Sequence, residues 1–428
     1  MRPEAGRECG GRLALAVCLG LSAFIGAAEA EPVTLTFWEA HSAQEEAATA
    51  EMVALFEREN PDIDVAMIRQ DFGTNFEKVF LAVAGGVAPD VTPIWGGLLS
   101  SFAARSALID LTSFGAAALR AAFFDGAWQF TQHAGRTWGV PYAADPRFLV
   151  YNRAMLDEAG IAAPPSTWEE LIDAARKLMR RTGDRISVWG FAFWPNVDLY
   201  STLLWSAGGD FFSADGKRAA FDSPAGVRAL QFLVDLYRSH GVASLAGRAE
   251  FVSGRVAMYY DGPWIAYEQA LQAPELEYGV AHMPSPAGGV RVNQASIGAY
   301  AGYAHSEHPE AVYRFLSFMG SRAAQAIRVR HLKTAVRPDV VGEAGLAAVF
   351  DAHPQLREMH EILVYSRIYP VHPRWGDVVT ILDAALLRAV EGEVSAQAAL
   401  SAAAAQVNQI LAETTAGQAQ GGERRHGR

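Results

Sequence analysis

Strand-like and helix-like patterns alternate along the first part of the chain. Residues 33–38 alternate between apolar and polar positions and are rich in β-forming residues, which predicts a strand. Apolar residues recur every three to four positions within 42–60, which predicts a helix. A strand at 63–68, a helix at 76–83 and a strand at 89–95 continue the series. This order is typical of a parallel α/β sheet.

Further helical patterns follow in the second half of the sequence. Residues 167–170, Thr-Trp-Glu-Glu, have the spacing of a capping box and predict the start of a helix. Residues 225–237, 309–318 and 378–411 also predict helices, the last Ala-rich and broken at Gly392. Because 428 residues exceed what one hydrophobic core usually covers, we expect two domains.

The first thirty residues have the pattern of an export signal. Arginines at the start are followed by the apolar stretch 13–28, and Ala28-Glu-Ala30 is a small-x-small cleavage site. We therefore expect residues 1–30 to be a cleavable signal peptide and the mature protein to be periplasmic or extracellular. At the other end, residues 415–428 are polar and Gly-rich, which predicts a flexible tail.

Both cysteines, Cys9 and Cys18, lie within the predicted signal. The mature chain then has none, which suits an oxidising compartment. Cys18 could instead carry a lipid anchor, but the bulky Val17 precedes it, so we interpret Cys18 as part of the apolar stretch. The formal net charge of −11 provides no basic face, and we expect no nucleic-acid partner.

The sequence contains no HExxH, GxSxG, Walker or GxGxxG motif of a catalytic site. His305-Ser-Glu-His308 is followed by Pro309 and predicts a helix-start loop better than a metal site. Tyr259-Tyr260, within Val-Ala-Met-Tyr-Tyr, predicts a buried strand rather than a ferric-ion site. We expect no enzyme activity, no cofactor and no metal, although a glycosidase would need only two placed carboxylates.

Short segments spread over nearly the whole chain match one family in collinear order. They include 56–65 (FERENPDIDV), 85–91 (GGVAPDV), 139–142 (GVPY), 254–258 (GRVAM) and 262–264 (GPW). With these segments the chain resembles family 1 extracellular solute-binding proteins, the maltose- and multiple-sugar-binding components of ABC importers.

The resemblance implies an α/β, two-lobed periplasmic-binding-protein fold, with each lobe a sheet flanked by helices and multiple crossings between the lobes. Lobe one would comprise residues 31–144 and 300–342, and lobe two 145–299 and 343–414. It also implies a monomer that binds a carbohydrate in the cleft between its lobes. Hinge closure would then signal to the membrane-spanning permease subunits of an ABC importer.

Aromatic planes stack on the apolar faces of a sugar, while carboxylates, amides and arginines bond to its hydroxyls. Residue type, position in turns and the resemblance together predict a ligand-binding site made of His41, Ser42, Trp95, Asp145, Arg147, Asn196, Trp264, Gly298, Arg337 and Trp375.

The three tryptophans of this set differ in their surroundings. Trp95 precedes two glycines, and Trp264 lies in a Gly-Pro-Trp turn, where tryptophan is rarely simple core. Trp375 could equally be a core anchor. His41 and Ser42 follow the first strand, at the carboxyl end where α/β sheets bind ligands, although His41 could also cap the next helix.

The arginines of the site leave the charge of the ligand open. If Arg147, Arg337 and Arg374 converge in the cleft, they would suit an anionic sugar derivative or glycerol phosphate, because arginine binds oxyanions with two hydrogen bonds. A neutral sugar is the first hypothesis and an anionic one the second. A non-sugar ligand such as an iron chelate or polyamine, and a secreted glycosidase, remain as other classes.

Overall fold

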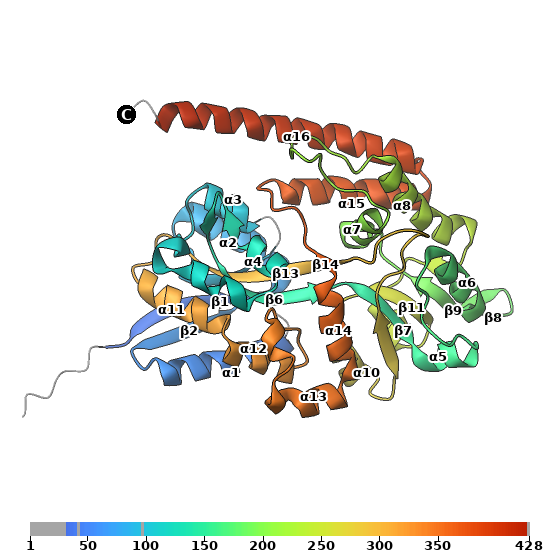
Figure 1. Ribbon diagram of the computed structural model, residues 1–428, viewed down its shortest axis with the longest axis horizontal. Helices are drawn as coiled ribbons and strands as arrows, with labels where there is room; N and C mark the ends of the chain where they lie inside the picture. The colour runs from blue at the N-terminus through green and yellow to red at the C-terminus, as the bar shows by residue number, and fades with distance from the viewer. Residues whose placement is uncertain (1–30, 41–42, 96–97, 426–428) are drawn as a thin grey trace, which may run out of the picture.

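The structure is a computed structural model that describes residues 31–40, 43–95 and 98–425 (Figure 1). The predicted signal peptide, and His41 and Ser42 of the predicted site, lie outside the described residues. Two sheets form the two lobes, and helices cover both. The α/β class and the two-lobed architecture are therefore confirmed.

Lobe one contains a six-stranded sheet. Its strands are β1 Val33–Glu39, β2 Ile63–Arg69, β3 Val91–Trp95, β6 Val140–Pro146, β13 Asn293–Gly302 and β14 Ser366–Arg367. The order is β14-β13-β3-β1-β2, and β6 also pairs with β13. Strands β2 and β3 both pair with β1 in parallel, as the alternating pattern at the start of the chain predicts. Strand β13 runs antiparallel to both β3 and β6 and brings a late segment into the centre of the sheet.

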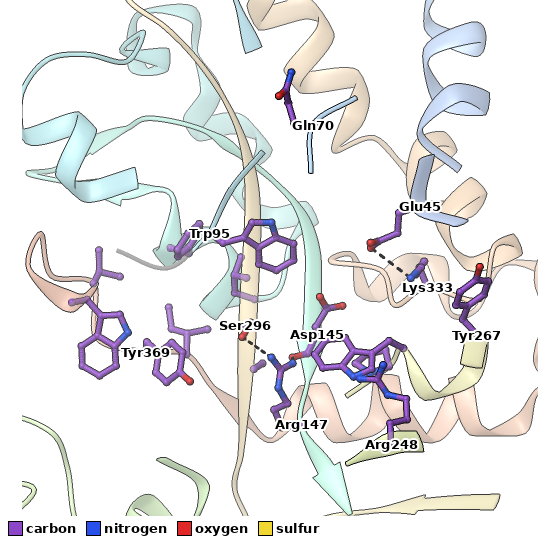
Figure 2. A pocket seen from close by; sticks show the side chains of 18 of the residues that line it. Glu45, Gln70, Trp95, Asp145, Arg147, Arg248, Tyr267, Ser296, Lys333 and Tyr369 are labelled. Carbon is purple, nitrogen blue, oxygen red and sulfur yellow. Dashed lines mark hydrogen bonds and ion pairs between the residues drawn. The ribbon is translucent and has the colours of Figure 1, made fainter. Parts of the chain in front are cut away.

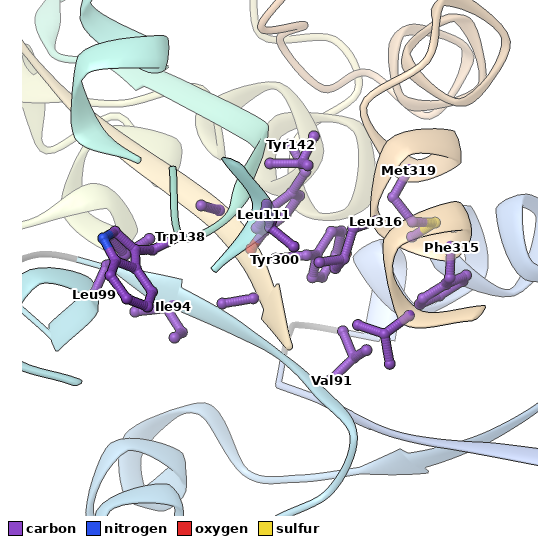
Figure 3. Close-up of a cluster of buried hydrophobic side chains, with 14 of the residues drawn as sticks. Val91, Ile94, Leu99, Leu111, Trp138, Tyr142, Tyr300, Phe315, Leu316 and Met319 are labelled. Carbon is purple, nitrogen blue, oxygen red and sulfur yellow. The ribbon is translucent and has the colours of Figure 1, made fainter. Parts of the chain in front are cut away.

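Helices pack on both faces of this sheet (Figure 1). They are α1 Ala43–Glu59, α2 Phe72–Gly85, α3 Leu98–Ala104, α4 Asp125–Phe130, α11 Pro309–Met319 and α12 Arg322–Arg330, with 3-10 turns η1 Leu111–Phe114 and η2 Ala116–Ala122 and the hairpin β4 Gln132–His133 and β5 Arg136–Thr137. The core between the sheet and α11 includes the stacked rings of Tyr142 and Tyr300, whose centroids are 3.9 Å apart (Figure 3). Both rings are fully buried.

Lobe two contains the second six-stranded sheet, in the order β10-β9-β11-β7-β12, with β8 paired to β9. Its strands are β7 Phe148–Asn152, β8 Arg180–Thr182, β9 Arg185–Ala192, β10 Ala243–Ser244, β11 Val256–Asp261 and β12 Tyr278–Ala281. Strands β9, β10 and β11 are parallel, and β7 is antiparallel to β11 and β12. Tyr259 and Tyr260 lie in β11, which confirms their interpretation as strand residues.

The helices of lobe two are α5 Arg153–Glu158, α6 Trp168–Leu178, α7 Val197–Ser206, α8 Pro224–Val234 with the π-turn η3 Asp235–Ser239, α9 Arg248–Val252, α10 Ile265–Gln272, α15 Trp375–Glu391 and α16 Ala396–Arg425. Thr167 and Glu170 form the predicted capping box of α6. Gly392 ends α15 in the left-handed conformation, as the predicted break requires. Helix α16 continues to Arg425, beyond the start of the predicted flexible tail, and this stretch contains no proline that would end the helix.

Within the described residues, the chain crosses between the lobes three times. A single residue, Arg147, separates β6 in one sheet from β7 in the other. The second crossing lies between β12 and β13, at residues 282–292, earlier than the predicted boundary at 299/300. Residues 293–299 therefore belong to the sheet of lobe one, where continuous burial of β13 fixes their place. The third crossing follows β14 and leads to α15.

A separate hydrophobic cluster joins the lobes beside these crossings. The connecting segment contributes η4 Pro338–Val340, η5 Ala344–Leu346, α13 Ala347–Ala352 and α14 Pro354–Val364. Met359 of α14 packs in the same cluster as Val329 of α12 and Tyr259 of β11. Among the described residues, no helix has the length and hydrophobicity that a membrane span requires.

Candidate ligand-binding site

A cavity of about 720 Å³ lies between the lobes, and both lobes supply its walls (Figure 2). The carboxyl ends of β2, β3 and β11 reach it, so it occupies the sheet edges at which α/β folds place ligands. The lining residues are Glu45, Arg69, Gln70, Asp71, Trp95, Ser100, Phe130, Asp145, Arg147, Arg248, Pro263, Trp264, Tyr267, Glu268, Ala295, Ser296, Ile297, Lys333, Ile368, Tyr369, Pro370, Val371 and Trp375.

Asp145 lies near the end of β6, just before the first crossing. The Thr334 hydroxyl donates to the Ala144 carbonyl at 2.6 Å and lies 3.3 Å from Asp145 Oδ1, which fixes this part of the strand. Burial raises the pKa of the Asp145 carboxyl, and the charge of Glu45 adds to this effect. The side chain presents a hydrogen-bond acceptor to the cavity (Figure 2).

Arg147 connects the two lobes through its guanidinium group. Nε donates to Asp198 Oδ2 in lobe two at 3.0 Å, and Nη2 donates to Ser296 Oγ of β13 at 3.3 Å (Figure 2). Nη1 donates to the Asp145 carbonyl at 3.2 Å. Arg147 therefore lines the cavity and also forms hydrogen bonds to both lobes.

Trp264 begins the turn into α10 and is held by charged neighbours. Its indole N–H donates to Asp261, and the guanidinium carbons of Arg147 and Arg248 lie 4.4 and 5.2 Å from its ring centroid. Arg248 in turn contacts Asp261 at 2.7 and 3.0 Å and Glu268 at 3.1 Å. The Trp264 ring, which we predicted to stack on the ligand, is thus part of a cation–π and ion-pair cluster on the lobe-two wall.

Trp95 lies on the opposite wall, half-buried at the end of β3. Its ring meets Tyr142 edge-to-face, with centroids 5.7 Å apart. Gly298 is its register partner, and a Cβ on that glycine would lie 2.8 Å from both the Trp95 and Tyr142 rings. Gly298 is therefore not among the residues that line the cavity. Because it has no side chain, it leaves room for the Trp95 indole, which does line the cavity.

Two other predicted residues lie outside the cavity lining. Asn196 is the N-cap of α7, where its side-chain oxygen accepts the Leu199 N–H at 3.1 Å. Arg337 forms a two-pronged ion pair with Asp339, at 3.0 and 2.8 Å. Both side chains therefore have local partners that account for their positions.

Trp375 lines the cavity but is also core, being 1% exposed. It packs against Phe211 and Tyr369, with both centroid distances 5.0 Å. Arg374, next to it, pairs with Asp377 instead of turning toward the cavity lining. Of the three arginines that the sequence offers for an anion site, Arg147 alone is among the described lining residues.

Sequence reasoning missed several lining residues, and the most informative are the other cations, Arg69, Arg248 and Lys333. Each lining cation has a carboxylate partner. Arg69 pairs with Glu46 at 3.1 Å, and Lys333 pairs with Glu45 at 3.6 Å. Arg147 and Arg248 are paired as described above.

The lining residues also include the carboxylates of Glu45, Asp71, Asp145 and Glu268. The positive charge of the wall is therefore balanced by carboxylates in and behind it. In the described parts of the chain, no cluster of three or more His, Cys, Asp or Glu side chains could hold a metal ion.

The sequence from residue 40 to residue 326 matches the family model for bacterial extracellular solute-binding protein. An uncharacterised lipoprotein of Streptomyces antibioticus is 31% identical over 333 residues, 71% of this chain and 71% of the relative. A maltotriose-binding protein of Pyrococcus abyssi is 23% identical over 254 residues, 56% of this chain and 53% of its own length. An ABC transporter solute-binding protein from Thermotoga lettingae, solved with α-D-tagatose, has a TM-score of 0.77 at 26% identity and covers 89% of this chain and 100% of its own. The chain belongs to the bacterial extracellular solute-binding protein family.

Proposed function

We propose that this protein captures a neutral carbohydrate in the cavity between its lobes and delivers it to the permease subunits of an ABC importer. The family assignment supports the binding role, and relatives that bind maltotriose and tagatose support the sugar. The predicted signal peptide supports export, and the mature protein would act as a monomer outside the cytoplasmic membrane.

We favour a neutral ligand because every described cation that lines the cavity is already paired with a carboxylate. Cationic side chains bind an anion best when their charge is uncompensated, since arginine and lysine that already neutralise carboxylates gain little from a second anion. Among the described residues of the cavity wall, the ion pairs of Arg147, Arg248 and Lys333 leave no such excess. A sugar needs hydrogen-bond donors and acceptors in fixed positions next to aromatic surface. In this cavity Asp145 supplies an acceptor and Trp95 supplies aromatic surface.

The size of the cavity fits this class of ligand. Small-molecule sites usually have volumes of roughly 300–1,000 Å³, and this cavity measures about 720 Å³. Family members bind and release their ligands, so an intact sugar should be recovered from the complex.

A thermal-shift screen of the chain from Glu31 onward tests the proposal. A ligand that binds only the folded state raises the melting temperature by mass action. Neutral mono- and oligosaccharides should raise it, and sugar phosphates and uronates should not. The Asp145→Asn variant should lose most of the shift, while Arg374→Gln, which alters a surface ion pair, should keep it. Shifts confined to anionic compounds would replace the neutral ligand by an anionic one, and recovery of cleaved sugar would indicate a hydrolase.

A further inference from the structure

The loop after β9 carries a tryptophan that the cavity lining does not include. Trp194 is 58% exposed, although tryptophan is highly buried on average. It lies two residues beyond the end of β9, in the sequence Phe193-Trp194-Pro195. An exposed indole at the carboxyl end of a parallel strand needs an explanation from what surrounds it.

Strand register places this loop between two segments that line the cavity. Ala192 of β9 pairs with Ser244 of β10 on one side and with Tyr259 of β11 on the other, and both pairings are parallel. The chain after β10 reaches Arg248, and the chain after β11 reaches Trp264, both of which line the cavity. The loop of Trp194 therefore leaves the same sheet edge, between these two segments.

Side-chain alternation gives the face of the sheet on which Trp194 lies. Phe191 and Phe193 share one face, where their rings stack with centroids 5.9 Å apart. Ala192 lies on the other face, in the same cluster as Tyr259 and as Ile265 of α10. The Phe193 N–H still donates to the Ser244 carbonyl at 3.1 Å, so the extended pairing continues one residue past β9. The same alternation carried one residue further would place Trp194 on the Ala192 face. The Arg248–Asp261–Trp264 cluster lies on the Ala192 face, at the same edge of the sheet.

We propose that Trp194 is a rim platform of the binding site, which stacks on a sugar unit that extends out of the cavity past Arg248. An indole offers a large flat surface at low entropic cost, and the apolar face of a pyranose matches it. The platform would make the protein prefer oligosaccharides over monosaccharides, and it rests on the proposed carbohydrate function.

An oligosaccharide binding series tests this inference. The mature protein, Trp194→Ala, Trp194→Phe and the control Phe80→Ala are titrated by calorimetry with glucose, maltose, maltotriose and maltopentaose, and with the same lengths of mannose and arabinose oligomers. Phe80 is also an exposed aromatic, 45% exposed on α2, but it does not line the cavity. Because Trp194 is exposed, its replacement should not impair folding, which melting curves without ligand would verify.

We expect Trp194→Ala to weaken binding of the longer members about three- to tenfold and to leave the shortest bound member unchanged, with Trp194→Phe intermediate and Phe80→Ala without effect. Equal affinities of Trp194→Ala and the unmodified protein at every length would overturn the platform while leaving the carbohydrate function intact. Absence of binding by the unmodified protein to every saccharide of this series and of the thermal-shift screen would overturn the carbohydrate function and the platform with it.

Discussion

Replacing Arg248 by methionine should destabilise lobe two substantially, because it removes the cation from a buried ion pair. Asp261 is 8% exposed, and Arg248 contacts both of its oxygens, at 2.7 and 3.0 Å. Breaking a buried pair from one side costs about 3–5 kcal/mol. The Tyr259 hydroxyl and the Trp264 indole still donate to Asp261, and Arg248 is 26% exposed, so we expect the lower end, about 3 kcal/mol at pH 8.

The cost should fall in acid. Burial already raises the pKa of Asp261, and removal of Arg248 raises it further. The folded variant then binds a proton that the unfolded chain does not, so its stability rises as the pH falls toward the raised pKa. The double variant Arg248→Met/Asp261→Asn should recover most of the loss at pH 8, since the charge left unpaired is gone.

Differential scanning calorimetry at pH 8 and pH 5 measures both effects, with a fall in melting temperature of roughly 6 °C for the single variant at pH 8. Arg255→Met serves as the matched control, because its partner Glu250 lies 3.5 Å away and the arginine is 61% exposed. An exposed pair contributes about 0–1 kcal/mol. If Arg248→Met cost no more than Arg255→Met, the reasoning about the buried pair would be refuted.

Three further predictions concern other parts of the molecule. Gly298→Ala should weaken ligand binding up to about tenfold and leave the far-UV circular dichroism unchanged, because the added Cβ would lie 2.8 Å from the Trp95 and Tyr142 rings and would displace the Trp95 ring of the cavity wall. Calorimetric titration with a ligand from the thermal-shift screen measures the loss. Burial lowers the pKa of His360 to about 4, so stability should fall as the pH drops from about 6.5 to 4, by about 3 kcal/mol at the lower end; urea unfolding should show a flatter pH profile for His360→Gln. Burial raises the pKa of Asp383 to about 6, so stability falls as the pH rises from about 4 to 6 and the full cost remains above that range. Asp383→Asn keeps an acceptor for the Val197 N–H and should melt higher than the unmodified protein at pH 8, by less at pH 5, and equally near pH 3.5. An unchanged melting temperature of Asp383→Asn at pH 8 would contradict that pKa.

The alternation of strands and helices predicted the architecture because each β–α unit near the N-terminus has its own periodic signal. Strands β1, β2 and β3 appear where the pattern places them. The crossing before β13 was harder to place, since a strand buried on both faces has no alternation. Its start is fixed by pairing with β14 at Asn293 and Gln294, and with β6 from Ala295 onward.

The same distinction applies to the site. Trp95, Asp145, Arg147 and Trp264 follow recognisable strand ends or turns, and the structure brings them together in one cavity. Arg248 begins a short helix after the two-residue strand β10, which has no periodic signal. Lys333 and its partner Glu45 are distant in sequence, so only the tertiary fold pairs them. In contrast, Arg337, which we expected in the site, pairs with Asp339 two residues away, and two opposite charges in one turn could have indicated this pairing.

The three crossings have a consequence for how the chain folds. Strand β13 lies at the centre of the lobe-one sheet, yet it is separated from β6, its neighbour in that sheet, by the whole sheet of lobe two. An N-terminal fragment ending before Asn293 would leave one edge of β3 unpaired and would remove the β13 partner of β6, a state prone to aggregation. Non-local pairing of this kind slows folding. Lobe one should therefore complete its sheet only after most of the chain is available.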